Sequence, residues 1–228
     1  MHTLSLLRGL RYVDSFFPSG GFAYSSGLEA AVQGGAVTDA ESFARYVEDL
    51  LQAGLATREA VAAARAWHAH ACGRARDAID ADGELDAMML CRESRSASRQ
   101  MGRQVIRAAG AEEGAPAVVR EHCETVESRR TPGHLAVAYG LVLGAAGWTK
   151  KQTVAAFLYQ QTVGFVSASF KLLPIGQREG QQLLDRWTPL IGSLSARAAQ
   201  EQTMTAWTPV QDIYAMRHSR LTSRLFRS

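Results

Sequence analysis

A stretch near the start of the chain gathers residue types that elsewhere serve phosphate binding or nucleophilic catalysis. Residues 14–32, DSFFPSGGFAYSSGLEAAV, combine a proline with several glycines, serines and aromatics. A P-loop needs lysine after its second glycine, but leucine follows Gly27, and the G-x-G-x-x-G dinucleotide pattern is also missing. The nucleophile elbow G-x-S-x-G fails because Ala23 occupies its first position. We therefore expect these glycines to shape turns, which leaves Phe22, Tyr24 and the serines unexplained.

Three potential metal ligands lie close together in the segment WHAHAC. His68 and Cys72 are four residues apart and would share one face of a helix, whereas His70 would point elsewhere. Two ligands do not close a metal site, although a second copy of the chain could complete one. The sequence favours a structural role, and His68, Cys72 and the C-terminal His218 remain the weak metal candidates.

Cationic residues at helical spacing are the next candidates for binding. One segment repeats arginine every three or four residues, at Arg92, Arg95, Arg99 and Arg103. A solvated helix face is typical of such a stripe, and an acidic protein partner is the alternative. Nucleic acid is not expected because no aromatic groove or DNA-reading motif accompanies the arginines. Lys171 ends an apolar helix, where it either reaches back to water or lies at an interface. His134, at a predicted helix start, is expected to be structural.

Composition and missing motifs favour a binding protein over an enzyme. No paired carboxylates and no H-E-x-x-H zinc motif stand out. The three cysteines form no C-x-x-C pair, which is typical of reduced thiols in the cytosol. The first fifteen residues lack the apolar core and cleavage site of a signal peptide. We expect a cytoplasmic, non-catalytic protein.

Hydrophobic periodicity predicts helices nearly throughout and no strands. The first helix is expected to end at Pro18, and residues 73–84 are expected to form a polar connection. A capping box of Thr38 and Glu41 should open a long helix, and Thr131 should cap another. The helices are predicted at residues 28–33, 39–72, 84–109, 115–128, 132–147 and 153–173, with another after Pro174.

Two of these helices are apolar enough to form the centre of the fold. The run of residues 135–147 has only thirteen residues, below the ~20 needed to cross a bilayer. Residues 153–173 carry Gln160 and Gln161 near their middle, which also argues against a membrane span. The fold class expected is therefore all-α: a single-domain multi-helix bundle with central apolar helices.

The end of the chain differs in composition from the rest. Residues 208–228 contain four arginines and one acid, which equals the net charge of +3 of the whole chain. We expect residues 1–207 to form the helical domain and residues 208–228 to form a loosely packed basic tail. Such a tail would become ordered on binding a partner, as part of the same functional unit.

Five motifs in order along the chain carry a family resemblance. They are DSFFPSGGFAYSSGLEAAV, SASRQMGRQ (96–104), PGHLAVAYG (132–140), SASFKLLPIGQREGQQLL (167–184) and the ending MRHSRLTSRLFRS. Together they resemble the urease accessory protein UreF family over nearly the whole chain. One departure is Ser219, where the family often has glutamate after the C-terminal histidine.

The resemblance implies a non-enzymatic, all-α, dimeric chaperone of urease maturation. A member of this family would bridge UreD (also called UreH) and the GTPase UreG, so that nickel enters the urease apoprotein. It would bind no cofactor directly, because nickel and GTP are handled by the complex. The residues expected to bind partners on this basis are Phe22, Tyr24, Ser25, Ser26, Glu29, Arg99, Arg103, Lys171, His218, Arg220 and Arg224.

Two other functions stay open at this point. A nickel carrier would use His68, His70, Cys72 or His218 as ligands. An α-helical domain with an unrelated binding role is the least specific alternative.

Overall fold

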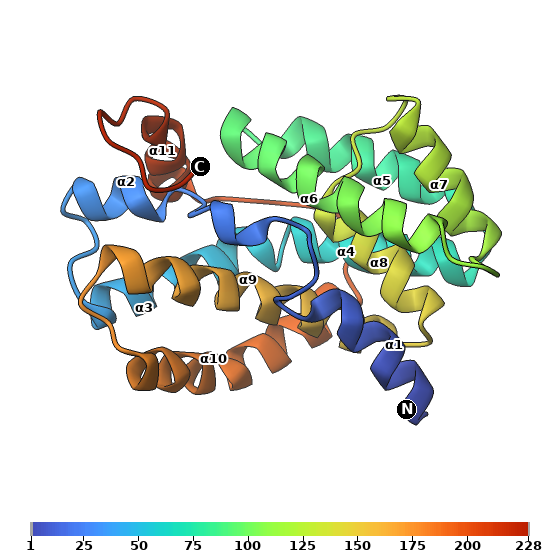
Figure 1. The fold of residues 1–228 in the computed structure, drawn as a ribbon, viewed down its shortest axis with the longest axis horizontal. Helices are drawn as coiled ribbons and strands as arrows, with labels where there is room; N and C mark the ends of the chain where they lie inside the picture. Colours follow the sequence, from blue (N-terminus) through green and yellow to red (C-terminus); the bar gives the residue numbers. More distant parts are fainter. Residues whose placement is uncertain (1, 228) are drawn as a thin grey trace.

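Helices build almost the whole of the protein (Figure 1). A computed structural model describes residues 2–227, which form eleven α-helices, a 3-10 turn and a π turn, with no β-strand. The elements are α1 (Thr3–Val13), η1 (Gly21–Ala23), α2 (Leu28–Gln33), α3 (Ala40–Leu50), η2 (Leu51–Leu55), α4 (Glu59–Ala71), α5 (Ala75–Met88), α6 (Arg92–Gly110), α7 (Ala117–Glu127), α8 (Leu135–Ala145), α9 (Lys150–Leu172), α10 (Gln177–Ala198) and α11 (Pro209–His218). The predicted all-α, single-domain class is confirmed.

The centre of the bundle is α8, which is buried on all sides from Leu135 to Leu143. Helices α4, α6 and α9 pack around it, and α5 and α7 lie at one end of the molecule (Figure 1). Gly140 lets α8 approach α4 closely, because a Cβ there would overlap the carbonyl oxygen of Ala63. The prediction of central apolar helices is confirmed by α8 and α9. No helix in residues 2–227 is long and apolar enough to cross a membrane.

The single helix predicted over residues 39–72 is wrong, because η2 and a short turn separate α3 from α4. The segment before α11 runs beside this break. Its backbone N–H groups at Thr205 and Trp207 donate to the carbonyl oxygens of Thr57 and Ala53, at 2.9 and 2.8 Å. A long-range contact therefore uses carbonyl groups at the break, and local periodicity does not reveal it.

The polar connection predicted at residues 73–84 is also wrong, since α5 covers most of it. The buried face of α5 is built mainly from alanine, at Ala75, Ala78 and Ala81, and it ends with Leu85. Alanine gives a weak hydrophobic signal, so the charged residues of the exposed face dominated the pattern. The next helix begins at Arg92 instead of Glu84.

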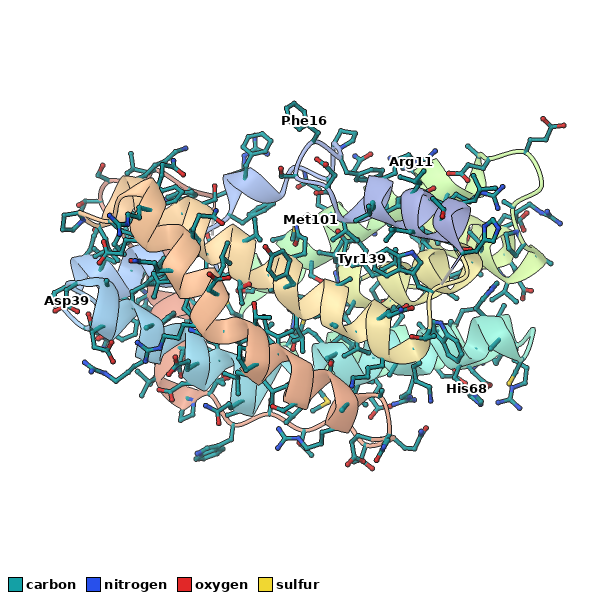
Figure 2. All side chains as sticks on the ribbon, turned by 90° about the horizontal axis from the view of Figure 1, so that it is seen from below. Arg11, Phe16, Asp39, His68, Met101 and Tyr139 are labelled. Atoms are coloured by element: carbon teal, nitrogen blue, oxygen red, sulfur yellow. The ribbon has the colours of Figure 1, made fainter. Side chains whose placement is uncertain are left out.

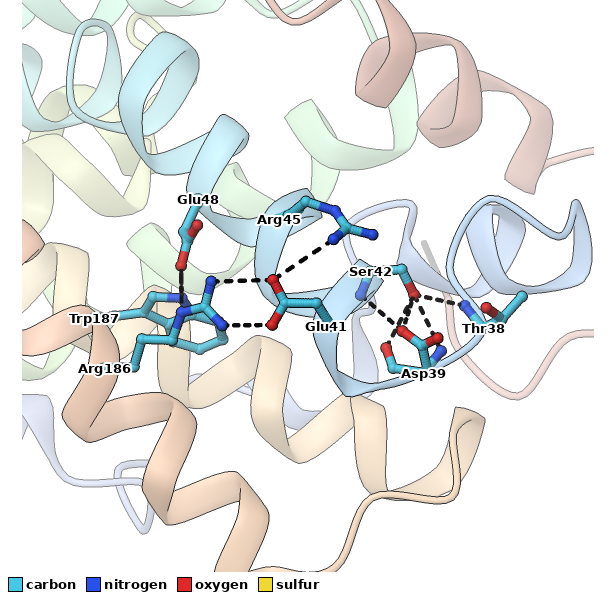
Figure 3. A network of polar contacts seen from close by, with 8 residues as sticks. All are labelled: Thr38, Asp39, Glu41, Ser42, Arg45, Glu48, Arg186 and Trp187. Atoms are coloured by element: carbon cyan, nitrogen blue, oxygen red, sulfur yellow. Dashed lines mark hydrogen bonds and ion pairs between the residues drawn. The ribbon is translucent and has the colours of Figure 1, made fainter.

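Several predicted helix ends differ from the structure. Asp39, not Thr38, caps α3: its carboxylate accepts from Ser42 N at 2.8 Å, and Ser42 Oγ accepts from Asp39 N at 3.1 Å (Figure 3). Helix α1 ends at Val13, before Pro18. Helix α8 has His134 as its N-cap residue, and Thr131 instead donates its hydroxyl to the Asp82 carboxylate at 2.9 Å.

Arg186 on α10 forms ion pairs with two acids on α3. Its guanidinium lies 2.7 Å from Glu41 and 2.9 Å from Glu48, both on α3 (Figure 3). Trp187, fully buried on the same helix, donates its indole N–H to Glu48 at 3.2 Å. These contacts hold α10 against α3, in agreement with the predicted helix after Pro174.

Candidate functional site

The glycine-rich stretch forms a turn whose shape depends on glycine. Gly20 and Gly27 have φ of 82° and 86°, the left-handed region in which only glycine is unstrained. A Cβ at Gly27 would also lie 2.9 Å from the backbone of Ala215 on α11. Between these glycines, η1 presents Phe22 with 78% of its surface exposed. The expectation of a structural glycine turn is confirmed.

Residues of helix α6 contact this turn and hold it in place. Tyr24 donates its hydroxyl to Gln100 Oε1 at 2.8 Å, and the space beside Gly21 is taken by Met101. Phe16, 95% exposed, projects away from the protein just before the turn (Figure 2). Two aromatic side chains thus stand out from a rigidly held loop, an arrangement typical of a surface that meets another protein.

The serines of the turn divide between the interior and the surface. Ser25 is buried, and its hydroxyl oxygen accepts from the backbone N–H of Glu29 at 3.4 Å. Ser26 is exposed and has a positive φ of 51°. Of the two, Ser26 is the residue that a partner could contact directly.

Glu29 is buried, with 1% of its surface exposed, and it binds the end of its own chain. Its carboxylate accepts from the backbone N–H of Leu225 at 2.7 Å and of Phe226 at 3.1 Å, and it lies 2.9 Å from His218 Nε2. Glu29 is thus covered by the C-terminal segment in this single chain, and its contact with a partner stays a prediction. A buried carboxylate needs such donors, and the C-terminal segment supplies them.

His218 bridges two carboxylates and has no exposed surface. Its Nδ1 lies 2.8 Å from Glu93 Oε2, opposite the contact between Nε2 and Glu29. The ring therefore links α2 to α6, because Glu29 lies on α2 and Glu93 lies on α6. Both ring nitrogens of His218 are occupied by carboxylates in this single chain, and its roles in partner and metal binding stay predictions.

The remaining C-terminal residues fold back over the same region. Arg224 reaches Glu93 at 3.3 Å, and Arg227 N donates to the carbonyl oxygen of Ala23 at 2.8 Å. Phe226 is buried, and the Lys171 ammonium lies 5.4 Å from its ring centroid. The loosely packed tail expected from composition is wrong, because the segment is packed onto α2, α6 and η1 within this single chain. Arg220 remains exposed, as predicted for a partner contact.

Arg99 and Arg103 of the arginine stripe on α6 line a groove next to the turn. Arg99 binds Asp86, with Nε to Oδ1 at 2.7 Å, and Arg95 donates to the carbonyl oxygen of Met89 at 2.8 Å. Arg103 is half-buried, and its Nε has no hydrogen-bond partner within residues 2–227. A groove of about 390 Å³ runs along Ser96, Arg99, Gln100, Arg103, Gln104 and Arg107. The stripe is thus partly anchored to the protein, unlike a fully solvated face.

His134 has the structural role that the sequence favoured. It is buried, and its ring nitrogens contact Ser98 Oγ at 3.0 Å and Asp86 Oδ1 at 2.9 Å. Burial lowers its pKa, although Asp82 and Asp86 oppose this shift. Burial tends to raise the pKa of Asp86, but Arg99 and His134 outweigh it and hold that pKa below its usual value. This cluster fixes the start of α8 against α6.

The structure brings together only two of the potential metal ligands near the end of α4. Cys72 Sγ lies 3.5 Å from His68 Nε2, and both residues are exposed. Burial lowers the pKa of His70, which faces Gly144 on α8. No group of three or more His, Cys, Asp or Glu residues in the described part of the chain is placed to hold a metal ion.

Three important residues were missed from the sequence. Glu93 is a single acid within an arginine-rich segment, which in retrospect marks it as a partner of nearby cations. Asp82 is buried, and it accepts from the backbone N–H groups of Gly133 and His134 at 2.6 and 2.8 Å. Gln100 offered no signal, because its role depends on where Tyr24 lies.

The fold and this surface define an all-helical protein that joins an N-terminal aromatic turn to a C-terminal basic segment. The sequence model of the UreF family matches residues 37–188. "Urease accessory protein UreF" of Bacillus sp. strain TB-90 is 29% identical over 98% of this chain and 99% of its own length. The proteins of that name from Mesorhizobium japonicum (32% identical, 99% and 97% covered) and Methylobacterium sp. strain 4-46 (33%, 96% and 87%) are similar. The chain belongs to the UreF family.

Proposed function

We propose that this protein is a non-enzymatic chaperone of urease maturation that bridges UreD (UreH) and the GTPase UreG. The observation that carries the proposal is the joining of the two ends of the chain into one surface. The backbone N–H of Arg227 donates to Ala23 in the turn, and Glu29 binds both Leu225 and Phe226. A scaffold that holds two partners together needs such a rigid, continuous surface.

Two parts of the surface suit two partners. The turn with Phe22 lies next to the groove that Arg99 and Arg103 line, and this aromatic and basic area suits an acidic face of the GTPase. The C-terminal segment presents exposed Arg220 and Leu225 and suits UreD. In this proposal the chain acts as a homodimer and delivers nickel to the urease apoprotein through its partners. Nickel and GTP are then substrates of the complex.

Complex formation tests the proposal directly. The purified chain is mixed with UreD and UreG from the same source, with GTP and magnesium, and the mass of each eluting species is measured by light scattering. We expect an assembly that contains all three proteins and two copies of this chain. Failure to form any assembly under any nucleotide condition would refute the bridging role.

A pair of variants locates the UreG contact. Phe22→Ala removes an exposed aromatic and should weaken UreG recruitment about tenfold or more, as truncation of an interface hot spot does. Leu7→Ala is the matched control, because Leu7 is 58% exposed on α1, away from the turn. Equal recruitment by both variants would remove Phe22 from the interface.

A nickel carrier remains the second candidate because His68 and Cys72 face one another at 3.5 Å. Equilibrium dialysis of the isolated chain against nickel distinguishes the two functions. Tight, stoichiometric binding that His68→Ala abolishes would favour the carrier. Binding that is weak, or that the substitution leaves unchanged, would exclude this pair from nickel transfer.

A further inference from the structure

A groove distinct from the surface described above lies between α3 and the segment that enters α11. Its volume is about 470 Å³. On one side are Tyr46, Asp49 and Gln52, and on the other side are Trp207 and Val210. None of the residues expected to bind UreD or UreG lines this groove. An inference about it therefore does not depend on the proposed function.

Trp207 gives the groove a flat aromatic wall. Its indole is 79% exposed, and its ring N–H makes no hydrogen bond within residues 2–227. The backbone of Trp207 is nevertheless fixed, because its N–H donates to the carbonyl oxygen of Ala53 at 2.8 Å. Val210, 55% exposed, extends the apolar wall by one turn of α11. A large aromatic that is held in place but left uncovered favours contact with a ligand.

The groove contains one acid, Asp49, which is not paired with a cation within residues 2–227. Asp49 is exposed and makes no hydrogen bond or ion pair within the described residues. Arg45, which also lines the groove, lies 3.6 Å from Glu41, and Glu41 also binds Arg186 (Figure 3). The carboxylate of Asp49 therefore lies beside the Trp207 wall without a cation of its own.

Tyr46 adds an unused hydrogen-bonding group at the floor. The residue is 6% exposed, and its hydroxyl has no hydrogen-bond partner within residues 2–227. Burial, with Asp212 and Tyr214 nearby, raises the pKa of this hydroxyl, so it stays protonated and neutral. A buried hydroxyl without a partner costs free energy, and a ligand that enters the groove can reduce that cost.

We propose that this groove binds an arginine side chain of a partner protein. A guanidinium stacks on an indole face and offers parallel N–H groups to one carboxylate, which matches Trp207 and Asp49. Lysine offers only a compact point charge and no planar face. Apart from Arg45, which is paired with Glu41, the other lining residues, among them Ala53, Val210 and Gln211, are uncharged. Such a lining suits the backbone of a polypeptide better than the charged termini of a free amino acid.

Nuclear magnetic resonance of the tryptophan indoles tests this site in the full chain. The protein has four tryptophans, and the indole signal that disappears in Trp207→Phe assigns Trp207. Titration with N-acetyl-arginine-N-methylamide should shift that signal with saturation in about the millimolar range. The capped citrulline residue, which has the same shape without charge, should bind at least about threefold more weakly. Capped lysine should also bind more weakly than arginine.

Three variants complete the test. Asp49→Asn should weaken arginine binding about threefold, while Glu121→Gln, a substitution of an exposed acid on α7, should leave it unchanged. In Trp207→Ala the backbone amide of Val210 should no longer respond to the ligand. The proposal is overturned if arginine causes no saturable shift, if citrulline or lysine binds equally well, or if Asp49→Asn binds like the unaltered protein.

Discussion

Replacing Glu29 by glutamine tests whether one buried carboxylate holds the C-terminal segment in place. The substitution keeps the size of the side chain but turns one acceptor oxygen into an NH₂ donor. In the better orientation the amide oxygen still accepts from Phe226 N and His218 Nε2, and the NH₂ group faces the Leu225 N–H. One hydrogen bond to the carboxylate is lost, and two donors oppose each other at Leu225.

The expected cost is about 2–3 kcal/mol, because hydrogen bonds to charged groups contribute about 1.5–3 kcal/mol each. This corresponds to an increase of about 30- to 150-fold in the equilibrium constant for opening of the C-terminal segment. The opening should be local, because His218, Leu225 and Phe226, which contact the carboxylate, all lie in the C-terminal segment. Global unfolding in urea should therefore shift less than the local opening does.

Amide hydrogen exchange at Leu225 and Phe226 measures this opening. Both amides should exchange about 30- to 150-fold faster in Glu29→Gln, with the exchange of α8 amides nearly unchanged. Glu41→Gln serves as the control, because Glu41 is exposed and its ion pairs within residues 2–227 are with Arg45 and Arg186. If Leu225 and Phe226 exchange at the same rate in Glu29→Gln and in Glu41→Gln, the carboxylate does not hold the segment and our reasoning is wrong.

Three further outcomes follow from buried or exposed contacts. Burial lowers the pKa of His122, so only the unfolded chain takes up its proton as the pH falls below about 6.5. The free energy of unfolding, measured by urea titration, should be highest above that pH and decrease towards pH 5. In His122→Leu this decrease should be smaller. Gly102→Ala should lower the free energy of unfolding by about 3 kcal/mol, since its Cβ would overlap the Gly133 carbonyl oxygen; a loss below 1 kcal/mol would show that α6 can move. Arg186→Ala should cost less than about 1 kcal/mol, because its ion pairs are exposed.

Sequence patterns predicted the elements whose burial is continuous. Helix α8 is apolar over nine consecutive buried residues, so the sequence predicted a buried helix whichever face packs against its neighbours. Helix α5 was missed because its buried face is mostly alanine, and alanine contributes little to a hydrophobic pattern. The break between α3 and α4 was missed for another reason. Its carbonyl groups at Ala53 and Thr57 are satisfied by residues about 150 positions later in the chain.

The exposed part of the candidate site was predicted better than its buried part. Phe22 and Arg220 are exposed as expected, since aromatic and basic residues in turns and tails have few intramolecular partners to find. The family resemblance named Glu29 and His218 as partner-binding residues, and in the structure they pair with one another across 189 positions. Local propensity cannot report a pairing of that kind, because each partner is costly to bury alone and stable only with the other.

The charge of the C-terminal segment explains why its composition predicted a loosely packed tail. Four arginines and one acid look like a tail that awaits an acidic partner, but the fold already supplies Glu29 and Glu93 as acids for this segment. Glu29 carried a signal, because it stands between Leu28 and Ala30 in a short apolar helix, where a carboxylate is buried only if donors reach it. Helix α2 itself offers no cation, so the donors had to come from a distant segment that can bring a positive charge and unpaired backbone N–H groups. The end of this chain, with His218 and the two amides at Leu225 and Phe226, meets both requirements.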